Sequence, residues 1–88
     1  MKRLLIKEKL YQIYQKQLCL ENNYFSRFSS DGENLLIKEE LGCDLLDLYE
    51  ILLQIESIFN IKLTDNEYFK CEKLLNLIDL IENKINKK

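Results

Sequence analysis

The chain has 88 residues and a net charge of −2, which suits one domain with a thin core and argues against nucleic acid as a partner. It contains no histidine, so serine–histidine and cysteine–histidine nucleophilic sites cannot be built, and it has no apolar run long enough to span a membrane. Its three cysteines are widely spaced and form no CxxC pair, which predicts reduced thiols in a cytoplasmic protein rather than a disulfide framework or a metal site.

The first third of the chain predicts a helix followed by a long loop. Apolar side chains recur at spacings of three and four between residues 3 and 19, as on one face of a helix: Ile6, Leu10, Ile13, Tyr14 and Leu18. Residues 20–34 break that period and are rich in Asn, Ser, Asp and Gly, which is typical of a loop. Three aromatic residues are expected to anchor this loop to the core: Tyr24, Phe25 and Phe28.

Capping signals mark the next two elements. Ser30 and Glu33 have the spacing of a capping box for a short turn, which we expect to end at Gly42. Asp44 is a favourable N-cap residue, and it predicts a second helix that runs through Phe59.

Two further helices are predicted after residue 60. Thr64 and Glu67 again have capping-box spacing, which predicts a short helix over residues 65–70. A last helix is expected over about residues 72–84, with helical spacing of its apolar positions: Leu74, Leu77, Ile78, Ile81 and Ile85. The sequence therefore predicts a single all-α domain over residues 1–88, with three longer helices, one short helix and a long loop between the first two.

The second helix carries two apolar stripes. One stripe is expected to face the core: Leu48, Ile51, Leu52, Ile55 and Phe59. A second lies almost opposite: Leu46, Tyr49 and Leu53. Polar residues flank this second stripe: Asp47, Glu50, Glu56 and Ser57. A second apolar stripe with an acidic rim indicates either a surface for a partner or a helix enclosed within the domain or in a homodimer.

Charge is distributed unevenly along the chain. Residues 1–20 carry five basic groups and one acid, whereas residues 39–58 carry six acids and no base. This contrast favours a basic partner surface for the second helix. The basic residues of the first helix do not gather on one face with aromatic residues, which argues against nucleic-acid binding.

Residues 40–85 closely resemble the second half of acyl carrier proteins. The matching segments keep their register without a gap from residue 40 to residue 82: Leu41-Gly42-Cys43-Asp44, Leu46-Asp47, Glu50-Ile51, Phe59-Asn60-Ile61, Leu63-Thr64-Asp65 and Ile78-Asp79-Leu80-Ile81. Asn60 stands where the family has glycine, and Thr64 stands where it has proline. The resemblance implies an acyl-carrier-protein-like four-helix bundle.

The resemblance places the family's phosphopantetheine-bearing serine at Leu45. In the family, that serine's hydroxyl attacks coenzyme A with the help of a transferase and magnesium. Leucine has no nucleophilic atom, so neither an attachment site nor a cofactor is expected here. Cys43 is the nearest thiol, but the family packs this position inward, and the surrounding acids would raise the thiol's pKa.

The function expected from these observations is a non-catalytic, acyl-carrier-protein-like interaction module in fatty acid, polyketide or related biosynthesis. Its partners would be basic-patched biosynthetic enzymes or another protein of the same pathway, and it would be neither an enzyme nor a metal protein. The expected partner-binding residues are Asp44, Leu45, Leu46, Asp47, Tyr49, Glu50, Leu53 and Glu56. The alternative is a true acyl or peptidyl carrier protein whose attachment serine is mutated or substituted at Leu45.

Overall fold

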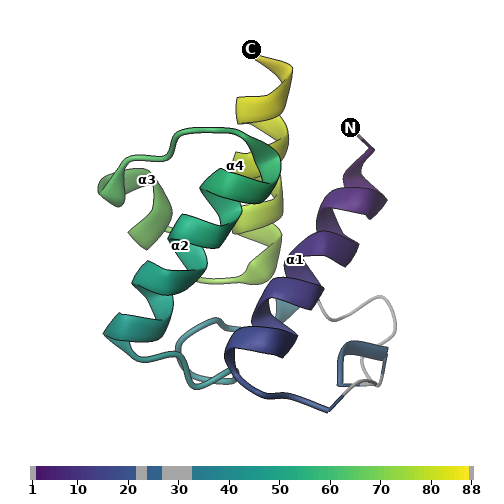
Figure 1. The fold of residues 1–88 in the computed structure, drawn as a ribbon, viewed down its shortest axis with the longest axis vertical. Helices are drawn as coiled ribbons and strands as arrows, with labels where there is room; N and C mark the ends of the chain where they lie inside the picture. The colour runs from purple at the N-terminus through teal and green to yellow at the C-terminus, as the bar shows by residue number, and fades with distance from the viewer. Residues whose placement is uncertain (1, 22–23, 27–32, 88) are drawn as a thin grey trace.

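The computed structural model of the protein describes residues 2–21, 24–26 and 33–87. Over these residues it contains four α-helices (Figure 1): α1 (Arg3–Gln17), α2 (Leu45–Phe59), α3 (Asp65–Phe69) and α4 (Leu74–Asn86). The predicted all-α bundle of three longer helices and one short helix, with a long connection between the first two, is thereby confirmed.

Helix α1 ends two residues earlier than the sequence predicted. Cys19 adopts a left-handed backbone with φ 55°. The amide of Leu20 donates to the carbonyl of Gln15 at 2.9 Å, and the amide of Cys19 donates to that of Lys16 at 3.4 Å. These two bonds form a Schellman motif, which satisfies carbonyls at the end of the helix and reverses the chain. The apolar period continues past this point and therefore overstates the length of the helix.

Helix α2 begins and ends where its capping residues predict. The Asp44 carboxylate accepts from the amide of Asp47 at 2.8 Å, and Asp47 accepts from the amide of Asp44 at 3.5 Å, which is a capping box. At the other end, Asn60 is left-handed with φ 55°, a conformation that asparagine tolerates better than most residues. Gly42, before the helix, is also left-handed with φ 70°. Residues 37–40 form a turn before Gly42, while the predicted Ser30–Glu33 capping box includes a residue outside the described part of the chain and stays a prediction.

The last two helices need small corrections. Thr64 and Glu67 form the predicted capping box of α3, which stops at Phe69 rather than residue 70. Helix α4 covers residues 74–86 instead of 72–84. Its start is delayed because the backbone at 72–74 pairs with residues 35–37: Ile37 donates to Glu72 at 2.9 Å, and Leu74 donates to Leu35 at 3.1 Å.

The loop after α1 is anchored as expected where it is described. Phe25 is buried and stacks on Tyr11 of α1 with ring centroids 4.2 Å apart. Tyr24 packs edge-on against Phe25. Phe28 and Ser30, the other loop residues given a role by the sequence, lie outside the described residues.

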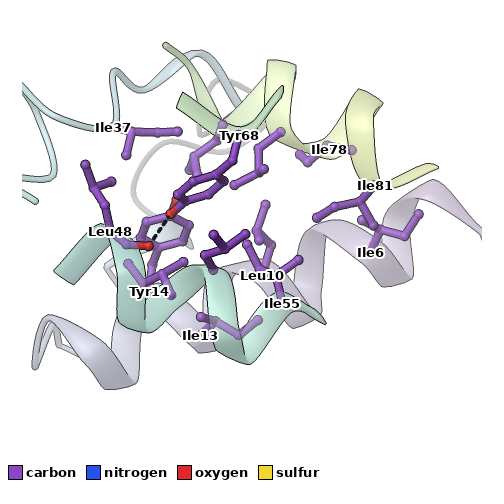
Figure 2. Packing of buried hydrophobic residues seen from close by; sticks show 14 of the residues in the cluster. Ile6, Leu10, Ile13, Tyr14, Ile37, Leu48, Ile55, Tyr68, Ile78 and Ile81 are labelled. Atoms are coloured by element: carbon purple, nitrogen blue, oxygen red, sulfur yellow. Dashed lines mark hydrogen bonds between the residues drawn. The ribbon is translucent and has the colours of Figure 1, made fainter. Parts of the chain in front are cut away.

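Helix α1 packs against both α2 and α4, and the core lies between these elements and α3 (Figure 2). The predicted inward stripes of all three longer helices are buried, apart from Leu18 and Ile85, which are half-buried at helix ends. Tyr68 of α3 also reaches into this core and hydrogen-bonds to Leu48 (Figure 2).

An ion cluster fixes the start of α1 to α4. The Arg3 guanidinium lies 2.6 Å from the Asp79 carboxylate and 3.4 Å from that of Glu82, and it also approaches Glu33 at 3.8 Å. These carboxylates raise the pKa of Arg3. The two chain ends lie at one end of the bundle in Figure 1, and α2 begins at the other end. None of the helices described has the length and apolar character needed to cross a membrane.

Candidate partner-binding surface on helix α2

The first residue of α2 is a leucine that projects into solvent. Leu45 is 63% exposed and directly follows the N-cap residue Asp44. Asp44 and Asp47 hold each other's backbone amides, so the start of the helix is well ordered by its own side chains. An exposed hydrocarbon therefore stands at a rigid, acidic helix start.

The nearest thiol is protected from reaction. Cys43 is only 8% exposed, and its pKa is raised to about 11, first by burial and then by the negative charges of Asp47 and Asp44. At neutral pH such a thiol is almost entirely protonated and is a weak nucleophile.

The second apolar stripe of α2 lies on the outside of the bundle. We call Leu46, Tyr49 and Leu53 the α2 ridge; Leu46 and Leu53 are 68% and 67% exposed, and Tyr49 is also exposed. Tyr49 is held in place by an edge-to-face contact with Phe69 of α3, with ring centroids 5.4 Å apart. The ridge is thus not enclosed within the domain.

A glutamine of α1 connects the acids beside the ridge. The Gln17 amide nitrogen donates to the carboxylate of Asp47 at 3.3 Å and also to that of Glu50. Its oxygen accepts from the Gln54 amide at 3.0 Å. These bonds hold two neighbouring carboxylates without neutralising either charge. The role of Gln17 was not foreseen, because no sequence pattern relates residues 30 or more positions apart.

The eight residues expected to bind a partner differ in their exposure to solvent. The described structure places Asp44, Leu45, the α2 ridge and Glu50 on the exposed surface of α2, whereas Asp47 is half-buried beside Gln17 of α1. Glu56 is also half-buried, and its carboxylate accepts from the amide of Leu63 at 3.0 Å. It therefore also stabilises the connection to α3, a second role that the sequence did not indicate.

The same residues offer no evident metal centre. Within residues 2–21, 24–26 and 33–87, no group of three or more His, Cys, Asp or Glu side chains is arranged to hold a metal ion. The acids of α2 instead cap backbone amides or bind the Gln17 amide.

Comparison with known proteins decides the family. No protein-family model matches the chain. The acyl carrier protein of Cylindrotheca sp. (strain N1) is 30% identical over 81 residues, covering 92% of this chain and 94% of that protein. The acyl carrier protein of Buchnera aphidicola subsp. Baizongia pistaciae (strain Bp) is 31% identical over 77 residues, covering 88% and 91%. The chain belongs to the acyl carrier protein family. A third acyl carrier protein, from Chlorobium phaeobacteroides, is 29% identical over 82 residues.

In this member of the family, the side chains at the start of α2 include no group suited to bear a phosphopantetheine arm. Leu45 has no heteroatom with which to form a phosphodiester, and Cys43 is buried with a raised pKa. Ser57, the hydroxyl-bearing serine of α2, lies more than three helical turns further along the helix. We therefore assign no covalent step at this position.

Proposed function

We propose that this chain is an acyl-carrier-like, non-catalytic interaction module of fatty acid, polyketide or related biosynthesis that carries no cargo. It acts as one domain, requires no cofactor, and docks on basic-patched biosynthetic enzymes or on another protein of the same pathway. The observation that carries the proposal is Leu45: an exposed hydrocarbon at the first residue of α2, directly after an intact Asp44–Asp47 capping box.

The docking residues proposed are Asp44, Leu45, Leu46, Asp47, Tyr49, Glu50, Leu53 and Glu56. The α2 ridge supplies apolar area that a partner would bury, and Tyr49 is the candidate hot spot because tyrosine is enriched at such positions. The carboxylates of Asp47 and Glu50 would steer a basic partner toward the ridge and raise the association rate more than the affinity. Leu45 would add an apolar contact where a loaded carrier would project its arm.

The absence of an attachment site is tested with a promiscuous phosphopantetheinyl transferase, coenzyme A and Mg²⁺. The wild-type protein should gain no mass, because phosphoryl transfer needs an attacking oxygen and residue 45 has none. Leu45→Ser should be modified, because Asp44, Asp47 and Glu50 remain in place around the new hydroxyl. Leu46→Ser is the matched control: the residue is equally exposed and adjacent, and its hydroxyl should stay unmodified.

Each outcome of this test has a definite meaning. A mass gain by the wild-type protein would contradict the cargo-free function, and peptide mapping would identify the modified residue. Modification of Leu45→Ser alone would support it and would indicate that the helix start is still a carrier surface. If neither serine variant were modified, the helix start would not be a surface that a transferase recognises, and docking through this surface would lose most of its support.

Docking is tested separately by measuring association with a ketosynthase of the same pathway. Glu50→Lys should slow association and reduce its salt dependence, because Glu50 is exposed and caps no backbone amide among the residues described. Asp47 and Glu56 are less suitable, since both accept backbone hydrogen bonds. Glu72→Lys changes charge equally at an exposed site off α2 and should leave the rate unchanged.

A further inference from the structure

A second amphipathic surface lies beside the α2 ridge. An open groove of about 310 Å³ between α1 and α2 is lined by Lys9, Gln12, Ile13, Lys16, Gln54 and Ile58, and we call it the α1–α2 groove. Ile58 is 46% exposed within it. Leu5, also exposed, stands one helical turn before Lys9 on the same side of α1. The groove thus has apolar parts and cations at its margin.

The cations of this groove, Lys9 and Lys16, have no ion-pair partner within residues 2–21, 24–26 and 33–87. Arg3 and Lys84, by contrast, are already paired with carboxylates of the same chain. The two groove lysines are therefore available to carboxylates from outside.

The α2 ridge and the α1–α2 groove are complementary in charge. The ridge combines apolar side chains with the carboxylates of Asp47 and Glu50, whereas the groove combines Ile58 with two ammonium groups. An apolar surface with a cationic rim is the kind of surface that the ridge would be expected to bind. This chain carries both halves of such an interface.

The placement of the two surfaces permits a closed pair. Helices α1 and α2 lie side by side on one face of the bundle (Figure 1). Gln17 at the end of α1 contacts Asp47 near the start of α2, so the helices run antiparallel, and the groove lies beside the C-terminal half of α2. Two α2 helices that meet antiparallel about a two-fold axis bring the acidic N-terminal half of each to the groove of the other. The same contact then forms twice and the assembly closes.

We propose that two copies of this chain form a two-fold dimer in which the α2 ridge of each copy sits at the α1–α2 groove of the other. Glu50 of one copy then faces Lys9 and Lys16 of its partner, and Ile58 covers part of the ridge. The dimer covers the α2 ridge, which the proposed function assigns to partner proteins. A chain in the dimer therefore cannot bind such a partner through the ridge at the same time. The inference does not rest on the proposed function, since it needs only the two surfaces.

Sedimentation equilibrium of the full chain over a range of concentrations tests the dimer. The wild-type protein should pass from monomer to dimer and stop there. Glu50→Lys alone, and Lys9→Glu with Lys16→Glu, should each weaken self-association on the order of tenfold, because each set places like charges across both contacts. An equimolar mixture of the two variants should regain the dimer, because both contacts are then again between opposite charges.

A matched charge control isolates the groove from net charge. Lys38→Glu with Lys70→Glu makes the same charge change at exposed residues outside the α1–α2 groove and should leave the dimer constant unchanged. Circular dichroism on every variant confirms that the helices are retained. A wild-type chain that stays monomeric throughout, a series of species larger than a dimer, or a mixture that fails to regain the dimer would each overturn the proposal.

Discussion

The hydroxyl of Tyr68 on α3 donates a 2.7 Å hydrogen bond to the main-chain oxygen of Leu48 on α2. This bond is buried and joins the shortest helix of the bundle to the first turn of a longer one (Figure 2). Burial raises the pKa of Tyr68 well above that of a free tyrosine, so the hydroxyl remains a donor throughout the neutral range. Tyr68→Phe should lower the free energy of unfolding by ~0.5–1.5 kcal/mol, the net value of such a bond, as measured by urea denaturation.

Tyr14→Phe makes the matched comparison. The Tyr14 hydroxyl is fully buried and has no hydrogen-bond partner among the residues described. Its removal abolishes a desolvation penalty and loses only the electrostatic contact with the neighbouring Tyr68 hydroxyl, so stability should be unchanged or slightly higher. A Tyr14→Phe variant that lost as much stability as Tyr68→Phe would indicate that the two hydroxyls act as one bonded pair.

Two adjacent leucines of α2 should differ sharply in their contribution to stability. Leu52 faces the core, and Leu53 is exposed on the α2 ridge. Leu52→Ala should cost ~2–5 kcal/mol because it leaves a cavity, whereas Leu53→Ala should stay within about 0.5 kcal/mol. Chemical denaturation of both variants measures this, and a larger loss for Leu53 would mean that the outer face is covered.

Acid should weaken the protein through Glu67. The Lys84 ammonium at 2.8 Å and the Thr64 amide lower the pKa of Glu67 from 4.5 to about 2. Because the folded pKa lies below the unfolded one, the carboxylate stabilises the fold above pH 4.5, and this contribution disappears as the pH falls toward 2. Thermal melting against pH should show Glu67→Gln less stable than wild type at pH 6 but equal to it below pH 2. A constant difference across that range would assign the effect to packing.

Thiol reactivity should follow exposure along the chain. Cys19 is exposed, while Cys43 is buried and has its pKa raised to about 11. At pH 8 only about one Cys43 in a thousand is then a thiolate. Iodoacetamide labelling followed by peptide mass spectrometry should therefore modify Cys19 long before Cys43. Early labelling of Cys43 would show that its thiol is accessible and reactive, contrary to its burial in the structure.

The sequence predicts local features of this fold well, because capping and helical spacing depend on nearby residues. Asp44, Thr64 and Asn60 mark helix boundaries that the structure confirms. The bounds of α1 and α4 were wrong by about two residues for different reasons. Cys19 adopts a left-handed backbone, which is not predictable from a cysteine in the sequence. The start of α4 is set by backbone pairing with residues 35–37.

The outer surface of α2 was predictable only in part. Helical periodicity separated Leu46 and Leu53 from the core stripe, since position on a helix face follows from spacing, but it left open whether this second stripe was enclosed; the structure shows both leucines exposed. The contact of Gln17 with Asp47 depends on how α1 packs against α2, and that of Glu56 with Leu63 depends on how the chain turns after α2. Helical spacing specifies neither contact. That the ridge binds a partner remains a proposal.

The Arg3 cluster has a consequence for the order in which this chain can fold. The bond from Arg3 to Glu82 spans 79 positions, so α1 completes its packing only when the final helix is present. During synthesis, the first helix has an incomplete core until α4 has left the ribosome. The entropic cost of closing a loop grows only slowly with its length. Bringing α1 and α4 together therefore costs little more free energy than closing a shorter loop would. The contact between α1 and α4 is therefore expected to form late in folding, after the segments between them have been synthesised.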